Sequence, residues 1–332
     1  MVSMDRNGAL LAANGIISLI LVAVILNYVG AAEVLNSLSS VNLLLLLAGM
    51  FFLLLMDLFM SYRIKLLLDH SGSAIAFIDI LKAHFVGMLG ADFTPARSGY
   101  FATAGVLHYK YKAPSEHAMI SIFGPQIYDF ALKLLVGTLA IIYILYRFIS
   151  PSQGWLILMG SLVMSFIVAF MLLLLFSERF LRMFAFAKKV PLASKAYALF
   201  GRMQENSHLV VSKTPELLAL MLLSWSAKSL SWYFVGKSVG ITISAGFPEV
   251  LFYFFLQPLV TMLEFIPTPT IAGLGLSEGG TTLVFSLFGV PAAFAATFAL
   301  LARFKTTFVH LPAVPEALDT FGKGRENKKI GK

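Results

Sequence analysis

The stretches that decide the fold read TPARSG at residues 94–99 and PTPTIAGLGLSE at residues 267–278. The first interrupts the apolar run 75–107, and the second interrupts the apolar run 247–289. Proline breaks helices and ionisable groups are costly in lipid, so an ordinary membrane helix carries neither at its middle. Irregular backbone at membrane depth is tolerated only where it is buried in protein or lines a cavity. In corresponding positions of two halves of a chain, such breaks indicate a transport site.

The composition places the chain in a membrane. Hydrophobic residues make up 58% of the sequence, charged residues make up 13%, and the mean hydropathy is +0.84. Soluble domains carry about 25% charged residues, so an ordinary soluble fold is excluded. The 332 residues have room for roughly eight membrane segments of about 20 residues each. We therefore expect an all-α polytopic membrane protein without a separate soluble catalytic domain.

The absence of cysteine and the net charge of +8 narrow the chemistry further. Without cysteine, neither disulfides nor thiolate metal sites are available. An excess of Lys and Arg in the loops is ordinary for membrane proteins and follows from their topology. We therefore expect no nucleic-acid partner.

The distribution of Lys and Arg predicts the topology. The stretches that read as full spans are 9–29, 41–60, 118–146, 154–176, 215–239 and 291–312. Basic residues follow the second span at Arg63 and Lys65, and they gather in the connection 177–214 and in the C-terminal tail, whereas 30–40 and 240–246 contain none. The positive-inside rule then places both termini and the long connection in the cytoplasm, at a cell (plasma) membrane.

The same charges constrain the two interrupted stretches. The stretch 75–107 lies between basic clusters and should enter and leave from the cytoplasmic side, whereas 247–289 should do so from outside. We therefore predict about six full spans plus two opposed re-entrant helical hairpins. The first half (1–150) and the second half (151–316) then form an inverted repeat, with an amphipathic cytoplasmic link at 177–214 and a basic cytoplasmic tail at 317–332. Eight plain spans with proline kinks are the alternative.

Ionisable side chains within the apolar stretches are candidates for function, because each costs about 2.5–3.5 kcal/mol in lipid. Arg97 and Arg303 stand out, since a guanidinium binds phosphate through two hydrogen bonds. Half-helices that begin after the prolines would add N–H groups that favour anions. The predicted substrate-binding residues are Asp92, Arg97, Asp129, Lys133, Lys228 and Arg303.

Purely structural roles remain open for the same residues. Two internal salt bridges are the alternative interpretation: Arg97 with Asp92, and Arg303 with Glu278. Asp129 and Lys133 lie four residues apart on one helix face, which also suits a structural ion pair.

Glu264 and Glu278 are predicted to serve coupling or gating, because a carboxylate in a low-dielectric site can take up a proton near neutral pH. The coupling ion would be a proton or sodium. The residues predicted to break the helices are Pro95, Gly99, Pro267, Pro269, Gly273 and Gly275. The histidines are scattered, and the sequence has neither a Gly-rich phosphate loop nor a Gly-x-Ser-x-Gly elbow. We therefore predict a transporter rather than an enzyme, with no catalytic residue, no metal and no cofactor.

Both interruptions also resemble a known family, the flippase-like membrane proteins related to the transmembrane region of lysylphosphatidylglycerol synthase (the multiple peptide resistance factor). The family's Pro-x-Arg-x-Gly-Glu element is matched by PARSG at 95–99. Its Pro-x-x-Gly-x-Gly-x-x-Glu element corresponds to Pro267 or Pro269 with Gly273, Gly275 and Glu278, and a Gly-Val-Pro at 289–291 and Arg303 follow it. Asp129 also resembles a family position.

The resemblance covers residues 10–312 and implies a lipid-transporting membrane protein. Tyr100 stands where the family usually has Glu, and Thr103 stands where it often has Arg. These departures imply a different head group or coupling ion at the first hairpin. We expect the chain to lack the aminoacyl-transferring soluble domain of the full synthase, so lipid lysinylation is not expected of it.

Our leading hypothesis is a lipid flippase-like transporter that moves an amphiphile with an anionic phosphate head group between leaflets. The candidate substrates are a phospholipid, an aminoacylated lipid and a polyprenyl phosphate with or without a sugar. One alternative is a membrane enzyme acting on a polyprenyl-linked sugar, which would need the outer-loop residue Glu33. Another is a small-solute or ion secondary transporter. The sequence leaves the oligomeric state open.

Overall fold

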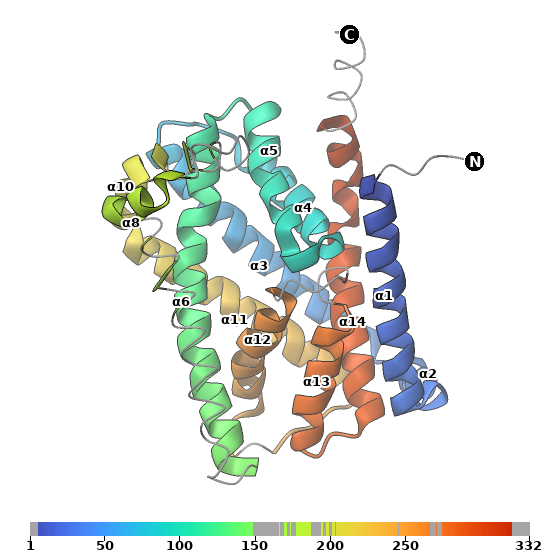
Figure 1. The fold of residues 1–332 in the computed structure, drawn as a ribbon. Coiled ribbons are helices and arrows are strands. Elements are labelled where there is room, and N and C mark those ends of the chain that lie inside the picture. The colour runs from blue at the N-terminus through green and yellow to red at the C-terminus, as the bar shows by residue number, and fades with distance from the viewer. Residues whose placement is uncertain are drawn as a thin grey trace, which may run out of the picture. The chain divides into compact units, whose positions relative to one another are not determined.

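The structure, a computed structural model, is all-helical over the residues that it describes (Figure 1). These are residues 6–148, 177–186, 201–202, 204–244, 246–265 and 274–320, with a few single residues between 166 and 198 and at 270. Helices satisfy every backbone hydrogen bond within the segment, which is what a chain of this hydropathy needs in lipid. The all-α class predicted from the composition is confirmed.

The helices of the N-terminal part are α1 (Arg6–Val29), α2 (Ala31–Ser39), α3 (Leu43–His70), α4 (Phe77–Phe93), the 3-10 helix η1 (Pro95–Phe101), α5 (Ala102–Tyr109) and α6 (Ser115–Phe148). The later ones are α8 (Glu178–Met183), α10 (Ser207–Ser212), α11 (Thr214–Ser238), α12 (Glu249–Phe265), α13 (Leu276–Leu287), α14 (Ala292–His310) and the 3-10 helix η5 (Leu311–Ala313).

Several of these helices suit a membrane. Within the described part of the chain, three are long and apolar enough to cross one: Leu43–His70, Ser115–Ala140 and Ala292–Thr320. A fourth is possible if the pair Gly15–Val29 and Ala31–Ser39, bent by 88°, counts as one broken span. Apolar side chains along α1 and α3 are exposed, among them Leu19 at 69% and Leu44 at 76%. Such faces fit contact with lipid tails. The predicted span 154–176 lies almost entirely outside the described residues.

Two boundaries differ from those expected. Residues 31–39, predicted to belong to an outer loop, form α2, and the chain turns into it at Gly30 with φ of 96°. Helix α3 continues past residue 60 to His70. Arg63 is therefore part of α3 and is only 3% exposed, although the sequence pattern places it among the loop charges. Its buried ion pair, described below, accounts for the difference.

The chain divides into two compact units, each built from separated segments. The first contains residues 1–56, 85–100 and 225–315, and the second contains residues 57–84, 101–224 and 316–332. Each unit takes segments from both predicted halves, 1–150 and 151–316. The inverted repeat of those halves remains a prediction.

The first unit is organised around α14. Helices α12, α13 and α14 pack in chain order, and α14 also contacts α1 and α2 (Figure 1). Its core is aromatic: Tyr253, Phe285 and Phe298 are fully buried, and the last two rings lie 4.9 Å apart. Gly236 makes room for the Tyr253 hydroxyl, since a Cβ there would lie 1.9 Å from it. Small residues at such contacts let membrane helices approach closely.

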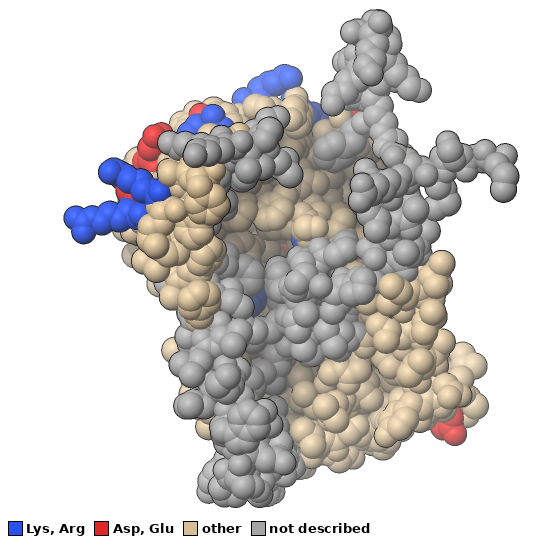
Figure 2. All heavy atoms as spheres, viewed as in Figure 1, with Lys and Arg blue, Asp and Glu red and all other residues tan. Residues whose placement is uncertain are grey.

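The second unit has a smaller core. Helices α5 and α10 pack on α6, and Leu67, Ile120, Val210 and Leu217 form a buried cluster. Figure 2 shows charged side chains gathered around α8 and α10, whereas much of the rest of this face is uncharged or not described. The basic and aromatic composition of 177–214 fits the predicted interfacial link, which remains a prediction.

Candidate functional site

The first interruption is a tight backbone turn that presents Arg97. Helix α4 ends at Phe93, and η1 begins at Pro95. The Thr94 hydroxyl donates to the Gly90 carbonyl at 2.9 Å and accepts from the Gly99 amide at 2.6 Å. Gly99 lies directly against Gly90, because a Cβ on Gly99 would lie 2.2 Å from the Gly90 carbonyl. Within this turn Arg97 adopts a φ of 53°, a conformation that is uncommon for non-glycine residues.

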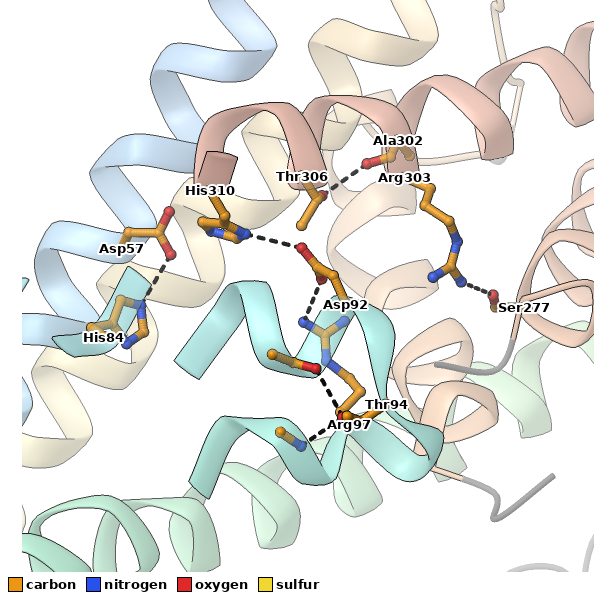
Figure 3. Close-up of polar contacts among 12 residues, drawn as sticks. Asp57, His84, Asp92, Thr94, Arg97, Ser277, Ala302, Arg303, Thr306 and His310 are labelled. Atoms are coloured by element: carbon orange, nitrogen blue, oxygen red, sulfur yellow. Dashed lines mark hydrogen bonds and ion pairs between the residues drawn. The ribbon is translucent and has the colours of Figure 1, made fainter. Parts of the chain in front are cut away.

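Asp92, in the last turn of α4, joins Arg97 to α14. Its Oδ1 lies 3.5 Å from Arg97 Nη2, and its Oδ2 lies 3.1 Å from His310 Nδ1. His310 is fully buried and packs edge-on against Phe85 at 5.5 Å between ring centroids. Figure 3 shows the carboxylate lying between the guanidinium and the imidazole. One of the two salt bridges left open by the sequence, Arg97 with Asp92, is therefore present.

The second interruption presents Glu278 at the N-terminus of α13. Gly275, with φ of 92°, precedes the helix, and its amide donates to Glu278 Oε2 at 2.6 Å. The Ser277 hydroxyl donates to the same oxygen at 3.0 Å. A side-chain carboxylate that accepts the amide before the first turn is a stabilising cap. A Cβ on Gly275 would lie 2.4 Å from Leu21 Cβ, so α1 packs directly on this turn.

Arg303 of α14 completes this group. Its Nε donates to Glu278 Oε1 at 2.5 Å. Its Nη2 donates to Ser277 Oγ at 2.8 Å, and Figure 3 shows this second contact. The Arg303 side chain is 18% exposed and the Glu278 side chain is 5% exposed. The second salt bridge left open by the sequence is therefore present as well. Such a buried pair is only weakly stabilising overall, but removing one partner alone is costly.

These groups line one cavity within the first unit. Its polar lining comes from α4, η1, α11, α13 and α14 and comprises Asp92, Arg97, Lys228, Ser277, Glu278, Arg303 and Thr306. Lys228 Nζ lies 5.6 Å from the centroid of the Trp232 ring, which also lines the cavity. Both interruptions therefore contribute to one site, although they are far apart in the sequence.

Cations outnumber carboxylates among the described residues that line the cavity. Arg97, Lys228 and Arg303 supply three cations, and Asp92 and Glu278 supply two carboxylates, a difference of 3 − 2 = +1. Positive charge surrounded by apolar helices is suited to an anion, because screening by water is weak there. The arginines offer forked donors of the kind that bind phosphate.

The other predicted binding residues lie in the second unit. Asp129 of α6 accepts a hydrogen bond from Arg63 Nη1 at 2.9 Å, and both side chains are buried. Lys133 lies one turn further along the same helix and is half-buried. A second buried pair, His84 Nε2 with Asp57 Oδ1 at 3.1 Å, lies in this unit too. These contacts give Asp129 a structural partner that the sequence pattern did not identify.

Some predicted residues fall outside what the structure describes. Pro267, Pro269 and Gly273 are not among the described residues. Glu264 lies on the described backbone of α12, but its side chain is not described. Their predicted roles in helix breaking and in coupling stay predictions.

The sequence pattern missed three polar groups on α14 and α13. His310 and Thr306 lie seven and three residues after Arg303, spacings that place them on one helix face, and Ser277 precedes Glu278. Lys305, also overlooked, is fully buried and donates to Ser231 Oγ, which in turn donates to the Gly49 carbonyl at 2.6 Å. The spacing of Arg303, Thr306 and His310 could have indicated a shared polar face on α14, but only the packing of the helices identifies the partners of these residues. Among the described residues, no group of three or more His, Asp or Glu side chains is placed to hold a metal ion.

Comparison with known protein families identifies a match that covers nearly the whole chain. The family model described as "Lysylphosphatidylglycerol synthase TM region" matches residues 11–313, and the chain belongs to this family. This confirms the resemblance seen in the two interruptions, and it supports a membrane location and a lipid-related role. No curated protein matches the chain.

Proposed function

We propose that this member of the lysylphosphatidylglycerol synthase transmembrane-region family is a lipid flippase-like transporter. Its substrate would be an amphiphile with an anionic phosphate head group, moved between the leaflets of the cell membrane. The observation that carries the proposal is the placement of Arg97, Lys228 and Arg303 around one cavity among apolar helices. Gathering three cations among apolar helices is costly, and an anionic ligand offsets part of that cost.

The magnitudes favour an anion in this cavity. A unit charge about 4 Å from a guanidinium gains about 4 kcal/mol at an effective dielectric constant of about 20, against about 1 kcal/mol in water. The N-terminus of α13 lies at the same cavity through Ser277 and Glu278, and helix N-termini favour anions. A phosphate with one or two negative charges matches both features.

The carboxylates supply a means of gating. Glu278 and Asp92 hold Arg303 and Arg97 in the structure, so a phosphate must compete with them for the guanidinium groups. A cation that bound at Glu278 would offset its charge and release Arg303 to the substrate. We propose a proton or sodium as the coupling ion, with Glu278 and Glu264 in this role.

The finer architecture belongs to the same proposal. We propose about six full spans and two opposed re-entrant hairpins in an inverted repeat, with both termini in the cytoplasm. Support comes from the breaks after Phe93 and before Leu276, which bring Arg97 and Glu278 to the same cavity. Two hairpins that meet inside the protein would place a binding site there, accessible to either leaflet in turn.

A vesicle assay tests the proposal. The full chain is reconstituted in vesicles with a fluorescent phospholipid, and transbilayer movement is followed by quenching from outside. We expect Arg97→Ala and Arg303→Ala to lower the rate at least tenfold. Arg182→Ala should not change it, because that side chain is 73% exposed and pairs with Glu178 on the same helix, α8. Unchanged rates in both cavity variants would refute the assigned roles.

Mass spectrometry of copurified lipid would name the substrate class. Turnover of a polyprenyl-linked sugar, lost in Glu33→Gln, would favour the enzyme alternative. Uptake of a small solute or ion that does not depend on lipid would favour the other alternative, a small-solute or ion secondary transporter.

A further inference from the structure

His310 lies next to the polar cavity but does not line it. It is the last residue of α14 and is fully buried, and the described lining of the cavity includes Asp92 and Arg97 but not His310. The His310 side chain contacts α4 at two levels. Its ring packs edge-on against Phe85, and its Nδ1 lies 3.1 Å from Oδ2 of Asp92, seven residues later on the same helix. The gating described above gives this contact no role.

The two carboxylates of the cavity hold their arginines at different distances. Glu278 Oε1 accepts from Arg303 Nε at 2.5 Å. Asp92 Oδ1, in contrast, lies 3.5 Å from Arg97 Nη2, which is at the long limit of a hydrogen bond. The contact between Asp92 and Arg97 is therefore the weaker of the two, although both pairs line the same cavity.

The long contact to Arg97 follows from the second partner of Asp92. A carboxylate that pairs with a guanidinium only accepts hydrogen bonds, so Nδ1 of His310 carries the proton in their contact. Asp92 is 8% exposed, and water screens its charge weakly in such a site. A donor at Oδ2 draws the carboxylate towards α14 and reduces its hold on Arg97, in keeping with its place between the two groups (Figure 3).

We propose that His310 is a positioning residue of the phosphate site, which holds Asp92 back from Arg97 so that the guanidinium can bind the phosphate. This inference rests on the proposed function and names the group that sets how strongly Asp92 competes with the substrate. Without the Nδ1 donor, Asp92 should close on Arg97 and form the two parallel hydrogen bonds that a carboxylate and a guanidinium favour. A phosphate would then have to displace a stronger ion pair, and its affinity should fall.

Calorimetric titration with glycerol 3-phosphate tests the inference on the full chain in maltoside micelles, which contain no other phosphate. His310→Leu removes the donor and keeps most of the side-chain volume, and we expect it to weaken binding about tenfold, or about 1.4 kcal/mol. His310→Asn keeps an N–H group near the position of Nδ1 and should bind within about threefold of wild type. The control is His208→Leu, which should not change the affinity, because that histidine is exposed and bonds to the nearby Glu205 carbonyl.

Double-mutant cycles distinguish positioning from a purely structural role. In an Arg97→Ala background, His310→Leu should change the affinity less than twofold, because the group through which His310 acts is gone. In an Arg303→Ala background, the same substitution should still weaken binding about tenfold. His310→Leu/Asp92→Asn should bind more tightly than His310→Leu, since a neutral amide competes less for the guanidinium. An equal loss in every background would show a structural role and contradict the inference.

A measurement on the wild-type protein avoids any variant that folds poorly. When a phosphate binds Arg97, the guanidinium draws less on Asp92, so the hydrogen bond between Asp92 and His310 should shorten. The Nδ1 proton of His310 should then move downfield in the proton NMR spectrum when glycerol 3-phosphate is added. Its signal is identified by loss in His310→Asn or by its proximity to the Phe85 ring. A signal that stays in place at saturating ligand would contradict the inference.

The outcomes separate this inference from the proposed function. If neither Arg97→Ala nor Arg303→Ala weakens the binding of glycerol 3-phosphate, the proposed function fails. If binding depends on both arginines but His310→Leu binds as tightly as wild type, the inference fails alone.

Discussion

The ion pair between Arg303 and Glu278 gives the most exacting prediction. Replacing Arg303 with Met removes both hydrogen bonds of its guanidinium and leaves the Glu278 carboxylate, 5% exposed, without its cation. Breaking a buried pair in this way costs about 3–5 kcal/mol, chiefly because the remaining charge is uncompensated. We therefore expect Arg303→Met to lower the free energy of unfolding by about that amount.

The double variant Arg303→Met/Glu278→Gln should recover more than half of this loss. A glutamine at position 278 is neutral, and its amide oxygen still accepts from the Gly275 amide, which in the native protein donates at 2.6 Å. Both variants should lose phosphate binding equally, because both lack the guanidinium. Stability and binding are thereby separated in one series.

Reversible unfolding in mixed micelles, followed by tryptophan fluorescence, provides the measurement. The control is Arg182→Met, which breaks an exposed pair with Glu178 and should cost about 0.5 kcal/mol or less. If the double variant were no more stable than Arg303→Met alone, Glu278 would not be the charged partner of Arg303, and the gating argument would fail with it.

Three further predictions follow from particular contacts. Gly275→Ala should destabilise the protein by more than the roughly 1–3 kcal/mol that a non-glycine residue costs at positive φ, because its Cβ would also clash with Leu21. The control is Gly289→Ala: Gly289 has a φ of 79° and nothing within 4 Å of an added Cβ, so this variant should show the backbone strain alone. Equal losses of unfolding free energy in the two variants would contradict the packing of α1 on this turn. His310→Ala should cost about 1–3 kcal/mol by leaving the buried Asp92 Oδ2 without its partner, and His208→Ala, whose hydrogen bond to the Glu205 carbonyl is exposed, should be neutral in the same melts. The hydrogen bonds that Lys110 donates to Asp319 and Glu316 raise the pKa of Lys110 above its ordinary value of 10.5. Because the pKa of Lys110 is raised in the folded state, the stabilisation from its ion pairs is complete below the ordinary pKa of 10.5 and is lost as the pH rises through the folded-state pKa. Lys110→Met should therefore be less stable than wild type at pH 7, and the difference in unfolding free energy should shrink at higher alkaline pH. A difference that stays constant across that pH range would argue against the ionic contacts.

The local signals in the sequence predicted the class and the two breaks near the site. Hydropathy sets the all-α membrane class, because a chain in lipid must satisfy its backbone within helices. Arg97 and Arg303 stood out because an arginine within an apolar stretch is costly, and that cost depends only on its neighbours in sequence. The same reasoning wrongly assigned Arg63 to a loop after the second span, whereas this residue lies within α3 and is the buried ion-pair partner of Asp129.

The sequence by itself therefore determined a helical membrane protein with two broken stretches and a set of costly charges. Only the tertiary structure decided which charges meet: Asp92 reaches His310 across 218 residues, and Arg303 reaches Glu278 rather than a neighbour on its own helix. It also decided that Arg97, Lys228 and Arg303 line one cavity, whereas Asp129 belongs to a different compact unit. The physical reason is that helix formation and membrane partition depend on composition within one segment, whereas ion pairing and cavities depend on how segments distant in sequence pack together.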